Sequence, residues 1–166
     1  MRNILKCAEP ARIHKANARA DGFTLIELII TIAIIGILVA LLVPAFKNSV
    51  CKANEASAVS SLNAIRLAEA KYVSDHKEQY GTFKQLFEEG YLDKRFNDQQ
   101  PHHRGYIFTI TLTPKSDGKA ASYAVNANPE QWQGVGATGK NFYYLDPDSP
   151  ITYARERPAS VDDDAL

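Results

Sequence analysis

A long, uninterrupted apolar segment is the clearest pattern in this chain. Between Phe23 and Phe46 the only charged residue is Glu27. As a helix these residues span about 36 Å, which exceeds the roughly 30 Å of hydrocarbon in a bilayer. The pattern therefore predicts a membrane-spanning helix over residues 23–46. A carboxylate inside hydrocarbon is costly, so Glu27 is a candidate functional residue that needs a partner.

The apolar positions take on a helical period after this span. Residues 45–75 contain no Gly or Pro and are rich in helix-forming residues. Apolar residues then recur at spacings of three and four: Ala58, Leu62, Ile65, Ala68, Tyr72 and Val73. We expect an amphipathic continuation of the helix over residues 47–76, with this stripe packed on a sheet. Pro44 predicts a kink, or a locally unwound stretch reaching back towards Gly36.

The remaining pattern predicts one short helix followed by strands. Thr82 is a candidate N-cap and Gly90 a candidate stop for a helix between them. Alternating apolar positions then predict strands over residues 106–113, 122–127, 142–145 and 151–154. We expect an α+β fold in which an antiparallel sheet of three to four strands lies on the long helix. Its globular part is residues 77–155, and the acidic tail 156–166 is expected to be flexible.

Charge predicts how the span is oriented. The first 22 residues carry five basic residues against Glu9 and Asp21. Basic flanks stay in the cytoplasm, so residues after Phe46 are predicted to lie on the opposite side of the membrane. The segment is too long for the core of a secretory signal peptide, and Val43-Pro44-Ala45 is a poor cleavage site.

The residues that open the span resemble a known motif. Gly22 followed by Phe-Thr-Leu-Ile-Glu-Leu is similar to the processing motif of the type IV pilin superfamily, which includes the pseudopilins of type II secretion. The resemblance implies that prepilin peptidase removes residues 1–22, cuts after Gly22 and methylates Phe23. It implies that Glu27 acts in assembly and that the helix loosens at Gly36 and Pro44.

The resemblance also implies a function and partners. It implies the pilin fold and a structural subunit, not an enzyme. A platform protein and an ATPase would draw this subunit from the membrane, and the subunit would polymerise through its N-terminal helix. A pilus, a type II secretion pseudopilus and a DNA-uptake filament all stay open. So do a bitopic binding protein that never polymerises and a soluble exported protein.

The proposed partner of Glu27 is the amine that cleavage would create at Phe23. The two groups lie one helical turn apart, or face each other across neighbouring subunits. A buried charge is tolerable when it is paired, and removing one partner strands the other. Asp21 departs from the family's pattern, where Lys or Arg is common.

The charge balance and the cysteine content limit which other functions and bonds are expected. The chain after Gly22 carries 14 basic and 17 acidic residues, a net charge of −3, which does not favour nucleic-acid binding. Cys51 is its only cysteine, so an intrachain disulfide is excluded. We interpret Cys51 as a small apolar helix residue; an intersubunit bridge is the alternative.

Few residues suggest metal or enzyme chemistry. His102 and His103 are adjacent and would point to opposite faces of a strand, which makes them a poor metal pair. Asp146 and Asp148 are candidate calcium ligands together with carbonyls of the 128–141 loop. A Pro-Asp turn explains these two residues as well. We expect no other cofactor.

Overall fold

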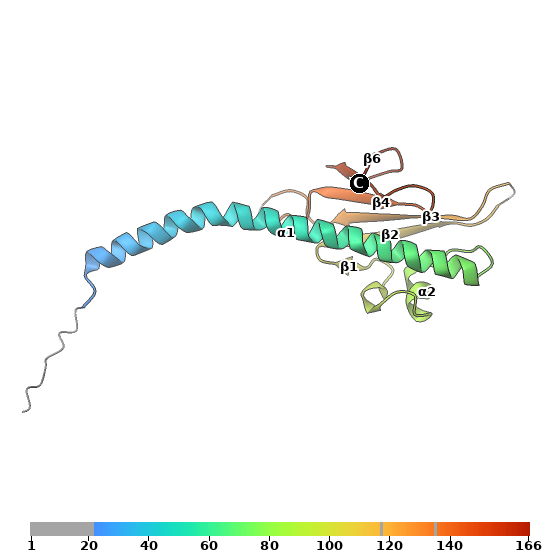
Figure 1. Ribbon diagram of the computed structural model, residues 1–166, viewed down its shortest axis with the longest axis horizontal. Helices are drawn as coiled ribbons and strands as arrows, with labels where there is room; N and C mark the ends of the chain where they lie inside the picture. Colours follow the sequence, from blue (N-terminus) through green and yellow to red (C-terminus); the bar gives the residue numbers. More distant parts are fainter. Residues whose placement is uncertain (1–21, 117, 135) are drawn as a thin grey trace, which may run out of the picture. The chain divides into compact units, whose positions relative to one another are not determined.

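The computed structural model describes residues 22–116, 118–134 and 136–166 (Figure 1). The predicted leader, residues 1–22, lies outside this range except for Gly22. The elements in chain order are α1 (Leu25–Asp75), α2 (Phe83–Glu88), the 3-10 helix η1 (Lys94–Phe96), β1 (His102–His103), β2 (Tyr106–Thr113), β3 (Ser122–Pro129), β4 (Asn141–Leu145), β5 (Thr152–Arg155) and β6 (Asp164–Ala165).

Helix α1 contains 51 residues and belongs to two compact units. The first unit ends at Ala40 and contains most of the apolar segment. The second comprises residues 41–166 and contains the rest of α1 and the sheet. The helix ends at Asp75, where the periodic pattern predicts its end.

The sheet is an antiparallel meander in which every strand pairs with its neighbours in sequence, in the order β1-β2-β3-β4-β5-β6. Strands β2 and β3 form the longest ladder, from Tyr106 opposite Pro129 to Thr113 opposite Ser122. The predicted α+β class is confirmed, but the expected three to four strands are six. The two unpredicted strands, β1 and β6, have two residues each, which is too short for an alternating pattern to be recognised.

The core lies between the second half of α1 and one face of the sheet (Figure 1). The predicted stripe of α1 supplies five buried residues: Ala58, Leu62, Ile65, Ala68 and Tyr72. The sheet supplies Tyr106, Phe108, Tyr123, Val125, Ala127, Tyr143 and Leu145. Burying a large apolar side chain contributes about 1.5–3 kcal/mol, so this face holds the second unit together.

Helix α2 closes one end of this core and begins as the sequence predicts. Thr82 Oγ1 accepts the Gln85 N–H at 3.3 Å, and Gln85 Oε1 accepts the Thr82 N–H at 2.9 Å, which is a capping box. The helix buries Phe83 and Leu86. The chain leaves it through Gly90, whose φ of +79° is the left-handed conformation that favours glycine.

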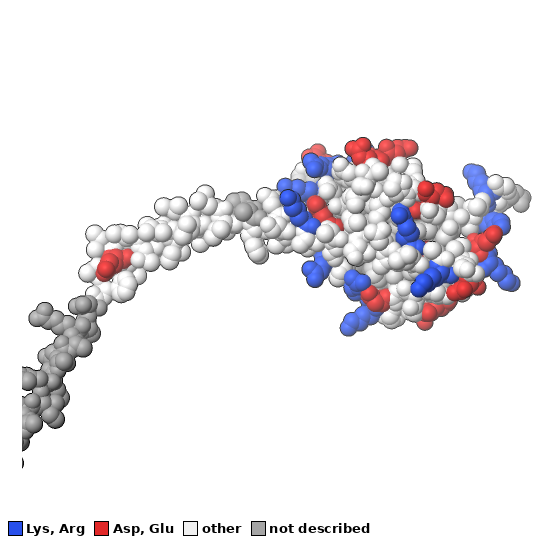
Figure 2. Space-filling model, in the orientation of Figure 1, with Lys and Arg blue, Asp and Glu red and all other residues white. Residues whose placement is uncertain are grey.

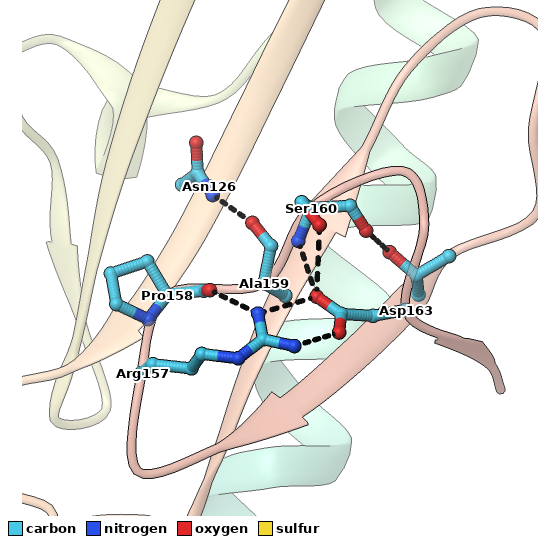
Figure 3. Close-up of polar contacts among 7 residues, drawn as sticks. Asn126, Arg157, Pro158, Ala159, Ser160 and Asp163 are labelled. Atoms are coloured by element: carbon cyan, nitrogen blue, oxygen red, sulfur yellow. Dashed lines mark hydrogen bonds and ion pairs between the residues drawn. The ribbon is translucent and has the colours of Figure 1, made fainter.

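The acidic tail, residues 156–166, makes specific contacts in the structure, and its flexibility stays a prediction. Arg157 Nη1 donates to Asp163 Oδ2 at 2.9 Å, and the same oxygen accepts the Ser160 N–H at 2.8 Å (Figure 3). A second ion-pair contact joins Arg157 Nη2 to Asp163 Oδ1. These contacts close a turn that brings β6 back along β5.

The turn of the tail is also fastened to the sheet. Thr152 Oγ1 donates to the Ser160 carbonyl at 2.6 Å, and Asn126 Nδ2 donates to the Ala159 carbonyl at 3.0 Å. Ala159 packs with Phe142 in a small apolar cluster separate from the main core. Because the contact of Asn126 joins residues 33 positions apart, the local acidic composition could not reveal it.

Candidate processing and assembly site

The first turn of α1 is organised by Thr24 and Glu27. Thr24 Oγ1 accepts the Glu27 N–H at 3.2 Å. The Glu27 carboxylate oxygen Oε2 in turn accepts the Thr24 N–H at 3.0 Å and the Thr24 hydroxyl at 2.9 Å. This reciprocal pair is a capping box, and it satisfies N–H groups that the start of a helix leaves unpaired.

The capping box fixes the direction of the Glu27 side chain. Its carboxylate is turned back towards the N-terminal end of α1, where the helix dipole also favours negative charge. Phe23 is the residue next to Thr24 on that side. A positive amine created at Phe23 would therefore arise one residue before the Thr24 N–H that this carboxylate accepts.

Gly22 and Phe23 are both exposed ahead of α1. Phe23 is 84% exposed. A Cβ added at Gly22 would meet no atom within 4 Å. The fold therefore places no steric demand for glycine at position 22, and Gly22 and Phe23 are accessible to another protein.

The apolar part of α1 has no partner within the described residues. Its Ile and Leu side chains between residues 25 and 42 are all at least half exposed. It is the one helix in the described part of the chain that is long and apolar enough to cross a membrane. A helix that is apolar all round is suited to a membrane or to the core of an assembly.

The N-terminal segment matches a family model, and the chain has curated relatives. Residues 17–43 match the model described as the prokaryotic N-terminal methylation motif. This N-terminal segment is similar to that of type IV pilins. The matched range contains Gly22, Phe23 and Glu27, the residues predicted to act in processing and assembly.

Three relatives show the range of the similarity to type IV pilins. The type IV major pilin protein PilA of Myxococcus xanthus is 39% identical over 72 residues, which is 43% of this chain and 32% of the relative. The type IV narrow pilus major component PilA5 of Thermus thermophilus is 54% identical over 52 residues, 31% of this chain and 45% of the relative. The type IV major fimbrial protein FimA of Dichelobacter nodosus is 42% identical over 57 residues, 34% of this chain and 36% of the relative.

These similarities cover a limited part of the molecule. The match spans less than half the length of each of the three relatives. No solved structure matches the chain. The fold of the globular unit therefore rests on its own contacts.

The backbone of α1 is helical throughout, including Gly36 and Pro44. A Cβ added at Gly36 would meet no atom within 4 Å, so close packing within the chain does not require glycine there. The loosening of the helix at these two positions stays a prediction. It concerns an assembled filament, in which neighbouring subunits would surround the helix.

The candidate calcium ligands lie in the turn between β4 and β5. Asp146 Oδ1 accepts the N–H groups of Asp148 and Ser149 at 2.9 and 2.6 Å. One carboxylate oxygen is thereby used to close the turn. Among the described residues no group of three His, Cys, Asp or Glu side chains is placed to hold a metal. Calcium binding by Asp146 and Asp148 stays a prediction.

The other side chains considered for chemistry have structural partners. His102 Nδ1 lies 2.9 Å from Glu130 Oε1, and His103 Nε2 lies 3.3 Å from Arg95 Nη1. Cys51 is buried, and its Sγ donates to the Ala137 carbonyl at 3.1 Å. This geometry agrees with the interpretation of Cys51 as a packed helix residue.

Two features of α1 were not predicted. The Thr24–Glu27 capping box could have been recognised, because Thr-x-x-Glu before an apolar run is its sequence signature. Glu69 lies on the buried stripe, fully inaccessible to solvent. Its Oε2 accepts the Gly81 N–H at 3.0 Å, and its Oε1 has no hydrogen-bond partner among the described residues. Burial raises the pKa of Glu69 to about 7.

Proposed function

We propose that this chain is a prepilin whose mature form is a structural subunit of a type IV pilus or a pilus-like filament. The observation that carries the proposal is the methylation motif at residues 17–43, which opens an exposed apolar helix. The printed names of the relatives, which are major pilus components, support the same function. The globular unit would then lie outside the apolar filament core.

The proposed sequence of events begins in the inner membrane. The basic leader remains in the cytoplasm, and residues after Phe46 lie on the other side. Prepilin peptidase cleaves the Gly22–Phe23 bond and methylates the new amine of Phe23. A platform protein and an ATPase then move the subunit into a filament of like subunits, which extends outside the cell.

Glu27 is proposed to set the register of assembly. The capping box already turns its carboxylate towards the N-terminal end of α1. A subunit that leaves the lipid headgroups behind would bury its new amine among apolar helices. Pairing with a Glu27 carboxylate, its own or a neighbour's, compensates that charge. Glu27 is the only acidic residue in residues 23–46, so each subunit brings no other carboxylate into the apolar bundle.

One observation favours a second candidate, a pseudopilin of type II secretion. After Gly22 the chain contains a single cysteine, Cys51, and Cys51 is buried. The globular unit therefore lacks the C-terminal disulfide loop of many type IV pilins. Both candidates share processing and polymerisation, so they differ in the machine served and not in the chemistry of the motif.

Mass spectrometry of the native protein tests the proposal. We expect a mature chain that begins at N-methylated Phe23, and electron microscopy should show filaments that contain it. The variant Gly22→Val should accumulate in the membrane with its leader intact. An intact Met1 terminus in the wild-type protein would instead favour a bitopic protein that never polymerises. Cleavage near Phe46 would favour a soluble exported protein.

A further inference from the structure

Basic side chains gather where α1 enters the globular unit (Figure 2). Lys52, Lys140 and Arg155 line a groove of about 340 Å³ between α1 and the β4–β5 side of the sheet. Lys47 lies on α1 just before them. The groove is completed by Asn48, Cys51, Glu55 and Asn141. All of these residues belong to the same compact unit, residues 41–166.

The one acidic residue of this groove is already engaged. Glu55 Oε1 accepts the backbone N–H of Lys140 at 2.8 Å and that of Asn141 at 3.3 Å. In the part of the chain that the structure describes, Lys47, Lys52, Lys140 and Arg155 form no ion pair with a carboxylate. The groove therefore presents a net positive charge that is available to an outside partner.

A contact of Lys140 shows how close this positive charge lies to the end of the predicted span. Lys140 Nζ donates to Asn48 Oδ1 at 3.3 Å. Asn48 is two residues beyond Phe46, which is about 3 Å along a helix axis. The headgroup layer on each side of a bilayer is roughly 5–7 Å thick. If the span ends at Phe46, the Lys140 ammonium group lies at the level of the headgroups.

The loop that carries Trp132 provides a second observation that points to a membrane. Trp132, the only tryptophan of the chain, is 36% exposed on the loop between β3 and β4. That loop is fastened to α1 by the Cys51–Ala137 hydrogen bond and by Asn54 Nδ2, which donates to the Thr138 carbonyl at 2.9 Å. Tryptophan is enriched at membrane interfaces, where its ring is apolar and its N–H is hydrated.

We propose that a basic collar docks on anionic phospholipid headgroups of the membrane that holds the span. The collar is defined by five residues: Lys47, Lys52, Lys140, Arg155 and Trp132. It would hold the globular unit in one orientation against the bilayer until the subunit is extracted. The proposal rests on the proposed membrane-inserted prepilin.

The distribution of charge over the globular unit supports one orientation. Apart from the four collar cations and Glu55, residues 47–166 carry 10 basic and 15 acidic residues. An anionic surface therefore attracts the collar and repels the remainder of the unit. Each Lys or Arg close to such a surface strengthens binding about fivefold. This interaction weakens with salt because surface charges are screened.

Fluorescence quenching of Trp132 tests the collar directly, because no other tryptophan contributes to the signal. The full chain is placed at one copy per nanodisc, in phosphatidylcholine alone or mixed with phosphatidylglycerol, with a nitroxide-labelled headgroup lipid as quencher. We expect strong quenching in the anionic discs, weaker quenching in the neutral discs and loss of the difference at high salt. Lys52→Gln with Lys140→Gln should lower the ratio of docked to free protein about fivefold per charge.

A matched control and the other outcomes complete the test. Lys84→Gln removes an exposed cation of α2 and should leave the quenching unchanged. Equal quenching in neutral and anionic discs, or no effect of the collar variants, would overturn the inference. A third outcome would also overturn the inference: quenching that requires two copies per disc and is lost in the double variant Asp162→Asn, Asp164→Asn. The collar would then bind the acidic tail of a second chain rather than lipid. A chain that alkaline carbonate strips from the discs would contradict both this inference and the proposed membrane insertion.

Discussion

The two halves of helix α1 use the same apolar residue types in opposite ways. Ile34 and Leu38 in the first half are 53% and 52% exposed, whereas Leu62 and Ile65 in the second half are 0% exposed. The second half has a sheet to pack on, and the first has no partner in the described chain. The second half of α1 is therefore stabilised by packing within the chain, whereas the apolar half has no such packing among the described residues.

The largest expected effect concerns the one charge of the exposed half. Glu27→Ala should permit cleavage after Gly22 but reduce filament yield by about a hundredfold or more, because it strands a buried amine. Filament yield is measured by shearing and immunoblotting. Glu27→Gln is the informative control, since glutamine preserves a capping box but carries no charge. Wild-type yield from Glu27→Gln would show that capping, and not charge pairing, is what assembly requires.

The contrast between the halves predicts different responses to truncation. Leu62→Ala should lower the free energy of unfolding by about 2–5 kcal/mol, because it opens a cavity in a packed core. Ile34→Ala should change it by less than about 0.5 kcal/mol. Denaturant titration of the full chain in detergent, followed by Trp132 fluorescence, measures both. Equal losses in the two variants would mean that the apolar half also packs within the chain.

A buried acid in the second half predicts a pH dependence. The pKa of Glu69 is raised from 4.5 to about 7, so the folded state holds its proton more tightly than the unfolded state does. The contribution of Glu69 to stability is therefore greatest below pH 4.5 and is lost as the pH rises through 7. The difference amounts to roughly 3 kcal/mol.

The variant Glu69→Gln isolates this contribution. Its stability relative to the wild type should rise between pH 5 and pH 8, because glutamine can still accept the Gly81 N–H and has no proton to lose. Denaturation midpoints at the two pH values provide the measurement. Parallel pH profiles for the variant and the wild type would contradict the assignment of the dependence to Glu69.

The smallest expected effect lies in the folded tail. Asp163→Asn weakens the contacts with Arg157 and Ser160, so a glutamate-specific protease should cleave after the exposed Glu156 several times faster while the core stays intact. Asp162→Asn, the exposed neighbour, is the matched control. Equal cleavage rates in the two variants would show that the Asp163 contacts do not hold the tail.

Local patterns predicted most of the fold. The apolar run, the stripe from Ala58 to Tyr72 and the Thr82 capping signal each lie within a few turns of one helix, where sequence spacing determines geometry. Four strands were predicted from alternation. Strands β1 and β6 were missed because two residues have no period. The contacts of the tail were not predicted, because Asn126, which binds the Ala159 carbonyl, lies 33 positions away in the chain.

The candidate site was predictable to a different extent. Gly22, Phe23 and Glu27 carry a motif whose meaning does not depend on tertiary structure, so the sequence sufficed to propose it. The capping partner Thr24 was visible in the same residues but was not recognised. The burial of Glu69 could not be predicted, because a charged residue beside an apolar stripe is recognised as buried only when the surface packed against it is known. The groove of Lys52, Lys140 and Arg155 likewise depends on the fold, which brings together residues some 90 to 100 positions apart.

The meander order of the sheet has a consequence for how the chain acquires its structure. Since each strand pairs with its neighbours in sequence, β-hairpins can form one after another with short loops to close, and topologies rich in such local pairings reach the native state faster. The contacts of α1 with the loop between β3 and β4, such as Cys51 with Ala137, bridge 86 positions and must wait for both partners. We expect the docking of the helix stripe to be the late step, completed only after the strands that it covers have paired.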